Sequence, residues 1–253
     1  MRFRLATRYV HQGYDVVFLK KNYRGEMELM EFSYQKIMET LMKINVIEEL
    51  RGKLFISGGI VPWIISETDS NRTHGDIDLI CKQEDMDLVR QKLKDYNIYA
   101  PELDSLTYPQ IGEVQDYGVD TYIGGVPVGF YPYEFKNGRI TQRSFTPDII
   151  EGKPDLKVKI IDGIDERDYL TTTMLSNGLI LGHSTLEMIK ATKKKANRSK
   201  DRHDIAQIDA IGTDSERQTR VDEAVARMKS ILDERRARRD KMPRRGGDNY
   251  DEH

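Results

Sequence analysis

Two aspartates in the run GDIDLIC (75–81) have the types and spacing that chemistry on phosphate groups requires. Asp76 and Asp78 are two residues apart, and the alternation of this run predicts a strand, so both carboxylates would leave the same face. Carboxylate oxygens are the hard ligands that Mg²⁺ takes. A pair of such ions roughly 3.5 to 4 Å apart can activate a hydroxyl and stabilise a leaving oxygen. The pair therefore predicts a metal site for phosphoryl-group transfer.

A glycine pair precedes these aspartates. Gly58 and Gly59 follow the apolar run KLFIS (53–57) and precede IVPWIISETD (60–69), which reads as a short helix. Without side chains, a turn between a strand and a helix lets backbone N–H groups approach a triphosphate, and the helix end favours negative charge. Ser57 would add a hydroxyl. The turn is therefore a predicted nucleotide-phosphate site.

The ordered combination of these features resembles a known signature. The run GGIVPWIISETDSNRTHGDIDLI (58–80) is similar to that of the polymerase-β-like nucleotidyltransferase superfamily. Its Arg-x-His-x-Asp-x-Asp spacing resembles the lincosamide and aminoglycoside nucleotidyltransferases. The later run LEMIKATKKKANRSKDRHDIAQI (186–208) resembles the Glu-x-x-Lys and Lys-Asp-x-x-Asp pattern of abortive-infection-type nucleotidyltransferase toxins. The resemblance covers roughly residues 50 to 210.

The resemblance implies roles for particular residues. Asp76 and Asp78 would bind two Mg²⁺ ions, with Mn²⁺ as an alternative, and Gly58 and Gly59 would contact the nucleotide phosphates. Arg72 would neutralise phosphate or brace the turn, and Lys190 would reach the triphosphate from the helical part. His74, in the turn before the aspartates, is expected to orient the loop or a ligand carboxylate rather than to bind metal.

The chain departs from the superfamily at the third carboxylate. This carboxylate stands on a later strand, and the aligned position in VPVGFYPYE (126–134) is Gly129. If Gly124-Gly125 forms a two-residue hairpin turn, Asp120 lies directly opposite Gly129, about 5 Å away, and could project into the space that Gly129 leaves empty. Asp120 is then the third metal ligand and the base, with Glu134 as a second candidate. Otherwise Asp120 is a solvated strand residue and the site is degenerate.

The elements that must position these residues follow from periodicity. Apolar residues at spacings of three and four predict a helix from Ser33 to Leu50, and EDMDLVRQKLKDY (84–96) predicts another. Two glycine turns within 116–143 predict a β-meander, to which LKVKII (156–161) adds a strand. Helices follow over 184–199, over 200–212 and, as one long charged helix, from about Ser215 to Met242.

The order of these elements predicts an α+β fold. A small mixed sheet flanked by helices would form a nucleotidyltransferase domain over residues 31–180, followed by a helical domain over 181–242 and a disordered tail over 243–253. Residues 1–30 are an N-terminal extension. Because Met27 and Met30 are also methionines, this extension is either strand-bearing or upstream of the true start.

Composition narrows the class of protein. With 38% apolar and 32% charged residues over 253 positions, the chain is expected to be globular, and its net charge of −2 gives no global basic field. The single cysteine, Cys81, lies in an apolar run and reads as a buried hydrophobe. No apolar stretch is long enough to span a membrane. A cytoplasmic protein is expected.

Two functions stay open from the sequence. The first is an enzyme that moves a nucleoside monophosphate from a nucleoside triphosphate, such as ATP, to a hydroxyl and releases pyrophosphate; the acceptor is a small molecule such as an antibiotic, or tRNA. The second is a catalytically inactive nucleotide-binding or protein-interaction module, which Gly129 favours.

Overall fold

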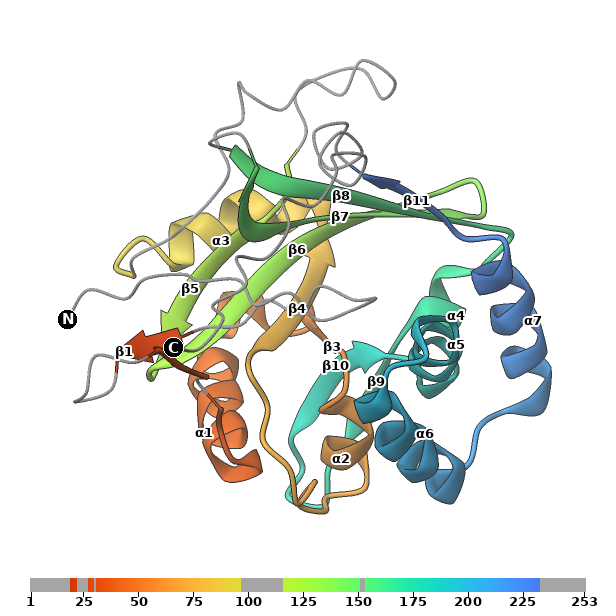
Figure 1. Cartoon of the computed structure of the whole chain (residues 1–253), viewed down its shortest axis with the longest axis horizontal. Helices are drawn as coiled ribbons and strands as arrows, with labels where there is room; N and C mark the ends of the chain where they lie inside the picture. The colour runs from red at the N-terminus through yellow and green to blue at the C-terminus, as the bar shows by residue number, and fades with distance from the viewer. Residues whose placement is uncertain (1–18, 22–26, 30, 97–115, 151–152, 233–253) are drawn as a thin grey trace, which may run out of the picture.

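A computed structural model describes residues 19–21, 27–29, 31–96, 116–150 and 153–232 of the chain. It has a mixed nine-stranded sheet with helices around it, in the strand order β11-β8-β7-β6-β4-β3-β10-β9, and β5 pairs with β6 outside this path (Figure 1). The mixed α/β architecture expected from the sequence is confirmed.

The first helix forms where the apolar periodicity predicts it. Helix α1 spans Tyr34–Asn45, and the Ser33 hydroxyl accepts a hydrogen bond from the Lys36 backbone N–H, which satisfies a free donor of the first turn. A short 3-10 helix, Glu48–Leu50, follows after a break. Its last residue is buried in the same core as the apolar side of α1.

The centre of the sheet consists of three strands. Strand β4 (Ile77–Lys82) pairs antiparallel with β3 (Phe55–Ser57) on one side and parallel with β6 (Val126–Lys136) on the other. Helix α2 (Val61–Ile65) follows β3, and α3 (Met86–Lys92) follows β4 after a 3-10 turn, Gln83–Asp85. The order strand, glycine turn, helix, strand and helix is as predicted.

The predicted β-meander is confirmed. Strand β5 spans Val119–Ile123, β7 spans Arg139–Ile150 and β8 spans Lys153–Asp162. Both predicted turns have positive φ at their two central residues, 61° and 87° at Gly124-Gly125 and 52° and 71° at Asn137-Gly138. Such a backbone matches the twist of a two-residue hairpin. Strand β5 pairs with the start of β6, and β7 pairs with its end.

Two strands near residue 180 were not predicted. Strand β9 (Leu170–Met174) follows the short helix α4 (Glu166–Tyr169) and pairs with β10 (Ile180–Ser184), which pairs in parallel with β3. The expected domain boundary therefore falls at the start of a strand that belongs to the main sheet.

The helical part is shorter than predicted. Helices α5 (Leu186–Ala196), α6 (Ser199–Ile211) and α7 (Ser215–Ala226) gather beside α4 (Figure 1). The single helix predicted to reach Met242 is wrong: α7 ends at Ala226, and Lys229–Leu232 form strand β11, which pairs antiparallel with β8. The backbone at the edge of β8 offers this segment hydrogen-bond partners, so the segment pairs as an edge strand.

Apolar side chains are buried on both faces of the central strands. On the core face, as we call it, Ile77, Leu79 and Phe130 pack in one cluster with α1 and α3. On the opposite face, which we call the site face, Ile80 and Tyr133 pack in a second cluster with α5 and α7. Since side chains alternate along a strand, Asp78, Gly129 and Tyr131 also belong to the site face.

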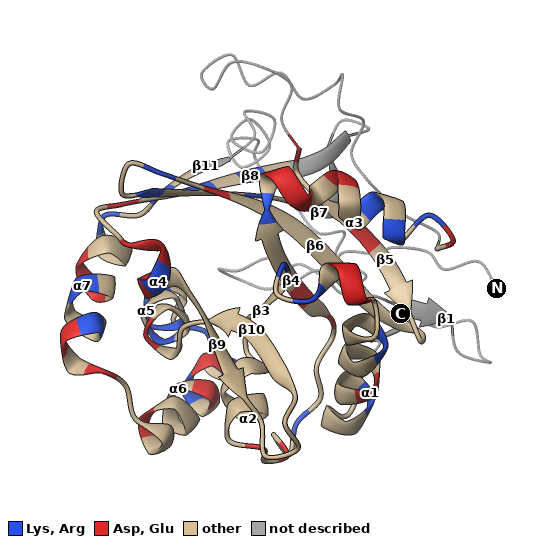
Figure 2. Ribbon diagram, turned by 180° about the vertical axis from the view of Figure 1, so that it is seen from behind, with Lys and Arg blue, Asp and Glu red and all other residues tan. Residues whose placement is uncertain are grey.

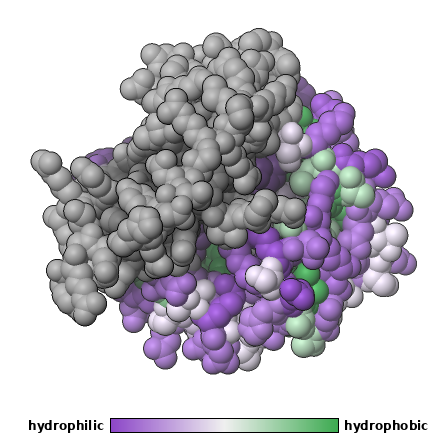
Figure 3. Space-filling model, in the orientation of Figure 1, coloured by the Kyte–Doolittle hydropathy of each residue, from purple (hydrophilic) through white to green (hydrophobic). Residues whose placement is uncertain are grey.

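The surface carries both signs of charge. Figure 2 shows acidic and basic residues mixed along α5, α6 and α7, and the visible described surface in Figure 3 is mostly hydrophilic. No helix in the described ranges is long and apolar enough to cross a bilayer. At the amino-terminal end, Leu19–Lys21 (β1) and Met27–Leu29 (β2) form an antiparallel pair, so the expected extension bears strands. The expected tail, 243–253, lies outside the described residues.

Candidate functional site

The glycine turn faces Asp78. Ser57, the last residue of β3, pairs with Asp78 across the antiparallel ladder, and Gly58 follows with a φ of +83° that only glycine adopts readily. A Cβ atom built on Gly58 would lie 3.7 Å from the Asp78 Oδ2 atom. The turn and the carboxylate therefore meet at one place on the site face.

The two aspartates differ in their setting. Asp78 lies within β4 between the buried residues Ile77 and Leu79, whereas Asp76 immediately precedes the strand. Burial chiefly raises the pKa of Tyr131, and the charges of Asp78 and Asp76 add to this rise. The prediction that both residues lie in the strand is thus wrong by one position at its start.

Asp120 occupies the register position predicted for it. In the β5–β6 hairpin Ile123 pairs with Val126, and counting outward Asp120 pairs with Gly129. Gly129 pairs in turn with Asp78 on its other side. Because residues paired across neighbouring strands share a face, the two aspartates flank Gly129.

The space above Gly129 is not empty. A Cβ atom at Gly129 would lie 2.5 Å from the Tyr131 hydroxyl oxygen and 2.6 Å from its Cζ atom, so the Tyr131 ring covers this position. Its hydroxyl donates a hydrogen bond of 2.8 Å to the Asp120 Oδ1 atom. The prediction that Asp120 fills the gap left by Gly129 is therefore wrong, because the aromatic side chain two residues further along β6 fills it. The alternative candidate, Glu134, is exposed and pairs with Arg143.

Both carboxylates that flank Gly129 hold protons more tightly than usual. Burial raises the pKa of Asp120 to about 7; the hydrogen bond from Tyr131 opposes this rise, and the charge of Asp78 adds to it. Burial also raises the pKa of Asp78, against the opposing charges of Lys159, Lys200 and Arg198.

Positive side chains approach Asp78 from two elements. Lys159 lies on β8, and Arg198 and Lys200 lie at the start of α6. Their charges lower the pKa of Asp78 against the larger effect of burial. Lys190, which the resemblance placed at the triphosphate, pairs instead with Asp209 on α6.

Gly59 has a different role from Gly58. A Cβ atom there would lie 2.5 Å from the Asp204 Oδ2 atom, 2.6 Å from Arg72 Nη2 and 3.2 Å from Lys193 Nζ. Asp204 is fully buried and accepts bonds from Arg72, from Lys193 at 2.7 Å and from the Trp63 indole N–H at 3.1 Å. We call Arg72, Lys193, Asp201 and Asp204 the ionic cluster.

The ionic cluster attaches the glycine turn to the helical part. Lys193 on α5 also donates to Asp201, and Arg72 donates to the Gly59 carbonyl as well as to Asp204. Of the two roles expected for Arg72, the structure shows that it braces the turn. Gly59 is accordingly placed against the ionic cluster, and Gly58 is the glycine that faces Asp78.

His74 lies in the loop that leads to the aspartates. Its Nε2 atom is 2.9 Å from the Ser70 hydroxyl, and its backbone exchanges two hydrogen bonds with Phe32. Burial is the main cause that lowers its pKa to about 4, and the charge of Arg72 adds to the effect. A neutral, buried imidazole in these contacts holds the loop, in line with the expected orienting role.

The donor set suits a hard divalent cation. Within the described ranges no three His, Cys, Asp or Glu side chains lie close enough together to hold a metal ion. Mg²⁺ does not require such a group, because it is often held by one or two carboxylates together with substrate phosphates and water. Asp78 and Asp120 can supply the carboxylates, and Ser57, paired with Asp78, a nearby hydroxyl. The Ser184 hydroxyl already donates to that of Ser57 at 3.3 Å.

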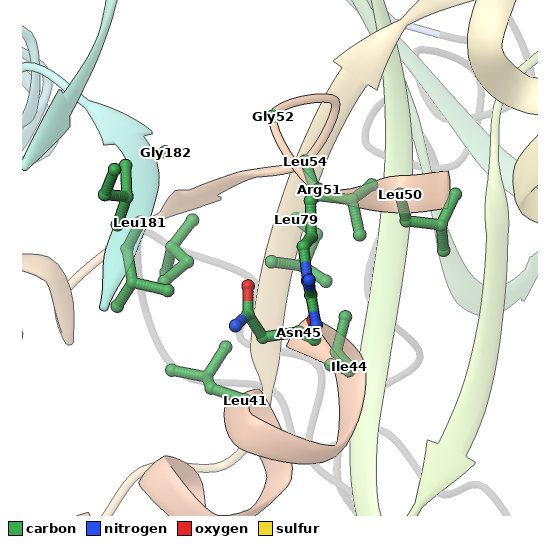
Figure 4. Close-up of a pocket in the computed structure, with 12 residues that line it drawn as sticks. Leu41, Ile44, Asn45, Leu50, Arg51, Gly52, Leu54, Leu79, Leu181 and Gly182 are labelled. Atoms are coloured by element: carbon green, nitrogen blue, oxygen red, sulfur yellow. The ribbon is translucent and has the colours of Figure 1, made fainter. Parts of the chain in front are cut away.

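A small cavity lies elsewhere. Its volume is about 40 Å³, and its lining includes Leu41 and Ile44 of α1, Leu79 of β4 and Leu181 of β10 (Figure 4). Leu79 belongs to the core face, so the cavity is separated from Asp78 by the sheet. A space of this size accommodates water rather than a nucleotide.

Two residues of this region, and the burial of a third, were missed from the sequence. Tyr131 and Lys159 alternate with buried residues on strands that were predicted, but only the pairing register brings them near Asp78. The sequence predicts that Asp204 forms a surface turn or pairs with nearby Arg and Lys; the ion pairs are confirmed, and only its burial was missed. Its spacing of three from Asp201, which places both on one side of a helix, was the available signal. A comparison with models of known families finds no match, and a comparison with curated proteins finds no relative.

Proposed function

We propose that this protein is a metal-dependent nucleotidyltransferase that moves a nucleoside monophosphate from a nucleoside triphosphate to a hydroxyl group. The observation that carries the proposal is the meeting of the Gly58 turn with Asp78, with Asp120 on the same face one strand beyond Gly129. A glycine turn beside carboxylates and cations suits a polyphosphate whose charge a cation neutralises.

The chain's own groups can be given roles in this reaction. The Gly58 turn would hold the triphosphate, and Asp120 would accept the proton of the acceptor hydroxyl, since a carboxylate with a pKa of about 7 can take up a proton near neutral pH. The acceptor oxygen forms a bond to the α-phosphorus as the bond to the pyrophosphate oxygen breaks. Bound Mg²⁺ or Mn²⁺ would neutralise charge on the phosphates.

The acceptor stays open between two classes. A small hydroxylated molecule needs only the site face, whereas tRNA would also need cations beyond it. Arg198 and Lys200, at the start of α6, are two candidates for such contacts. The cytoplasmic location remains a prediction from the sequence.

An inactive nucleotide-binding module is the second candidate. The Tyr131 ring over Gly129 favours it, because this ring and its bond to Asp120 stand where the superfamily has a third carboxylate. For the enzyme, Tyr131 must leave this position or leave Asp120 free to turn toward the substrate.

Nucleotidyl transfer can be tested directly. Each of the four nucleoside triphosphates, labelled at the α-phosphate, is incubated with Mg²⁺ and either total tRNA or a panel of hydroxylated small molecules, and labelled product and pyrophosphate are measured. We expect Asp78→Asn to abolish transfer. Asp87→Asn, at an exposed position on α3, is the control and should retain it.

Two outcomes would contradict the proposal. Transfer by Asp78→Asn at the wild-type rate would exclude Asp78 as a catalytic residue. Binding of a triphosphate by the wild type without transfer to any acceptor would leave the inactive module as the better account.

A further inference from the structure

Lys159 shares the site face with Asp78. In the register of the sheet Lys159 pairs with Gln142 of β7, Gln142 pairs with Tyr133 of β6, and Tyr133 pairs with Lys82 of β4. Directly paired residues share a face, and Lys82 is four residues from Asp78 on the same strand. The lysine is therefore directed to the side of the sheet that carries the predicted chemistry.

The ammonium group of Lys159 lacks a close carboxylate. Within the part of the chain that the structure describes, it makes no hydrogen bond and no ion pair within 4.0 Å, and neither does the side-chain carboxylate of Asp78. The charges of the two groups nevertheless act on each other, and Arg198 acts on both. Lys159 and Asp78 thus carry opposite charges on one face of the sheet without forming a direct ion pair.

Three lysines of α5 are satisfied differently. Lys193 contacts two carboxylates, Lys190 contacts Asp209, and Lys195 donates to backbone carbonyls at the end of α7. An ammonium group removed from water is unfavourable unless an anion or an acceptor compensates it. Lys159, which is partly buried, is the exception among these residues and is suited to a ligand that brings its own negative charge.

We propose that Lys159 binds the polyphosphate of the nucleotide, at the phosphates that leave as pyrophosphate. The Gly58 turn and the metal-binding carboxylates hold one end of the triphosphate, and Lys159 contacts the other end from β8. Arg198 cannot replace it fully, because its guanidinium is already bonded to Asp201 through Nε at 2.9 Å and Nη2 at 3.1 Å.

This inference rests on the proposed function but can be tested apart from it. Lys159→Met keeps the length of the side chain and removes its charge, and Lys159→Arg retains a charge. The control is Lys136→Met, at an exposed position of the same meander. Each protein is titrated calorimetrically in Mg²⁺ with the triphosphate that the wild type binds best, with the matching monophosphate and with pyrophosphate, after thermal melting has shown that it folds.

The expected pattern is selective. Lys159→Met should weaken binding of the triphosphate and of pyrophosphate by about tenfold or more, the range for losing one charged hydrogen bond, and leave binding of the monophosphate unchanged. Lys159→Arg should recover most of the affinity, and Lys136→Met should match the wild type.

The contrary outcomes separate the two ideas. Equal triphosphate binding by wild type and Lys159→Met would overturn the role of Lys159 while leaving nucleotidyl transfer intact, and so would an equal loss of monophosphate binding. If the wild type binds pyrophosphate through Lys159 but no nucleotide, the anion site stands and nucleotidyl transfer falls. If it binds neither, both proposals fall.

Discussion

Gly58 and Gly59 are neighbours that lack a side chain for different physical reasons. Gly58 adopts a φ of +83°, and a Cβ there would make ordinary contact with Asp78, whereas Gly59 lies against three charged side chains. The glycine pair was predicted as one phosphate-binding unit. At the level of single residues it divides into a turn residue that faces the site and a packing residue that admits the ionic cluster.

A methyl group should therefore be costly at Gly59. In Gly59→Ala the new Cβ would lie 2.5 Å from Asp204 and 2.6 Å from Arg72, so the buried bonds between them must open. We expect a loss of roughly 3 kcal/mol in the free energy of unfolding, the range for breaking a buried ion pair, as measured by urea denaturation. Gly75→Ala is the matched control, since nothing lies within 4 Å of a Cβ there, and it should change stability little. Equal effects of the two changes would contradict this account of Gly59.

At the scale of elements, the pairing of β5 with β6 decides whether a third carboxylate exists at all. A shift of one residue would turn Asp120 to the core face. This register requires a glycine at position 118. Its φ is +101°, and a Cβ there would lie 2.3 Å from the Phe130 carbonyl oxygen of β6.

Gly118→Ala should consequently displace β5. We expect lower hydrogen-exchange protection of the Val119 and Thr121 amides and, if the protein transfers nucleotides, loss of transfer through Asp120. The comparison is Gly125→Ala in the hairpin turn, which has a φ of +87° but open space around its Cβ and should cost only about 1 kcal/mol of backbone strain. Wild-type protection in Gly118→Ala would show that the register does not depend on this contact.

The elements that could be predicted from the sequence are those specified by residues close to one another along the chain. The glycine turns, the Ser33 cap and the alternation around Asp78 act over a few residues, and the elements they specify were predicted. Strands β10 and β11 were missed, the latter lying where a charged helix was expected, because their partners β3 and β8 are distant in sequence. Strand β9 was missed with them because it pairs with β10. The Tyr131 ring above Gly129 was missed because the alternation of residues along a strand predicts the face of a side chain but not which neighbour it packs on.

At the scale of the whole molecule, the ionic cluster connects the glycine turn to the helices α5 and α6. Burial alone would raise the pKa of Asp201, but hydrogen bonds from Arg198 and Lys193 outweigh it and lower the pKa to about 2. Lys193 and Arg72 likewise keep the pKa of Asp204 below its ordinary value despite burial. Each of these carboxylates is thus ionised in the folded state at a pH at which it would be protonated in the unfolded chain.

The cluster should therefore make the fold sensitive to acid. A carboxyl group whose folded pKa is depressed stabilises the fold above its ordinary pKa, near 4, and this stability is lost as the pH falls toward 2. Asp201→Asn should be less stable than the wild type at neutral pH and show a shallower decline below pH 4, with the two curves converging near pH 2. Urea denaturation between pH 7 and pH 2 measures this; parallel curves would contradict it.

The reactivity of the Cys81 thiol can measure how often strand β4 opens. Its thiol is fully buried on the core face, where it donates to the Met86 sulfur, and burial chiefly raises its pKa to about 12. Since it is the sole cysteine of the sequence, a thiol reagent can modify the chain only when the strand that carries Asp78 opens. A ligand on the site face that binds only the closed form should slow the labelling in proportion to its occupancy. The labelling rate of Cys81 on the core face would therefore report ligand binding on the site face, without any introduced probe.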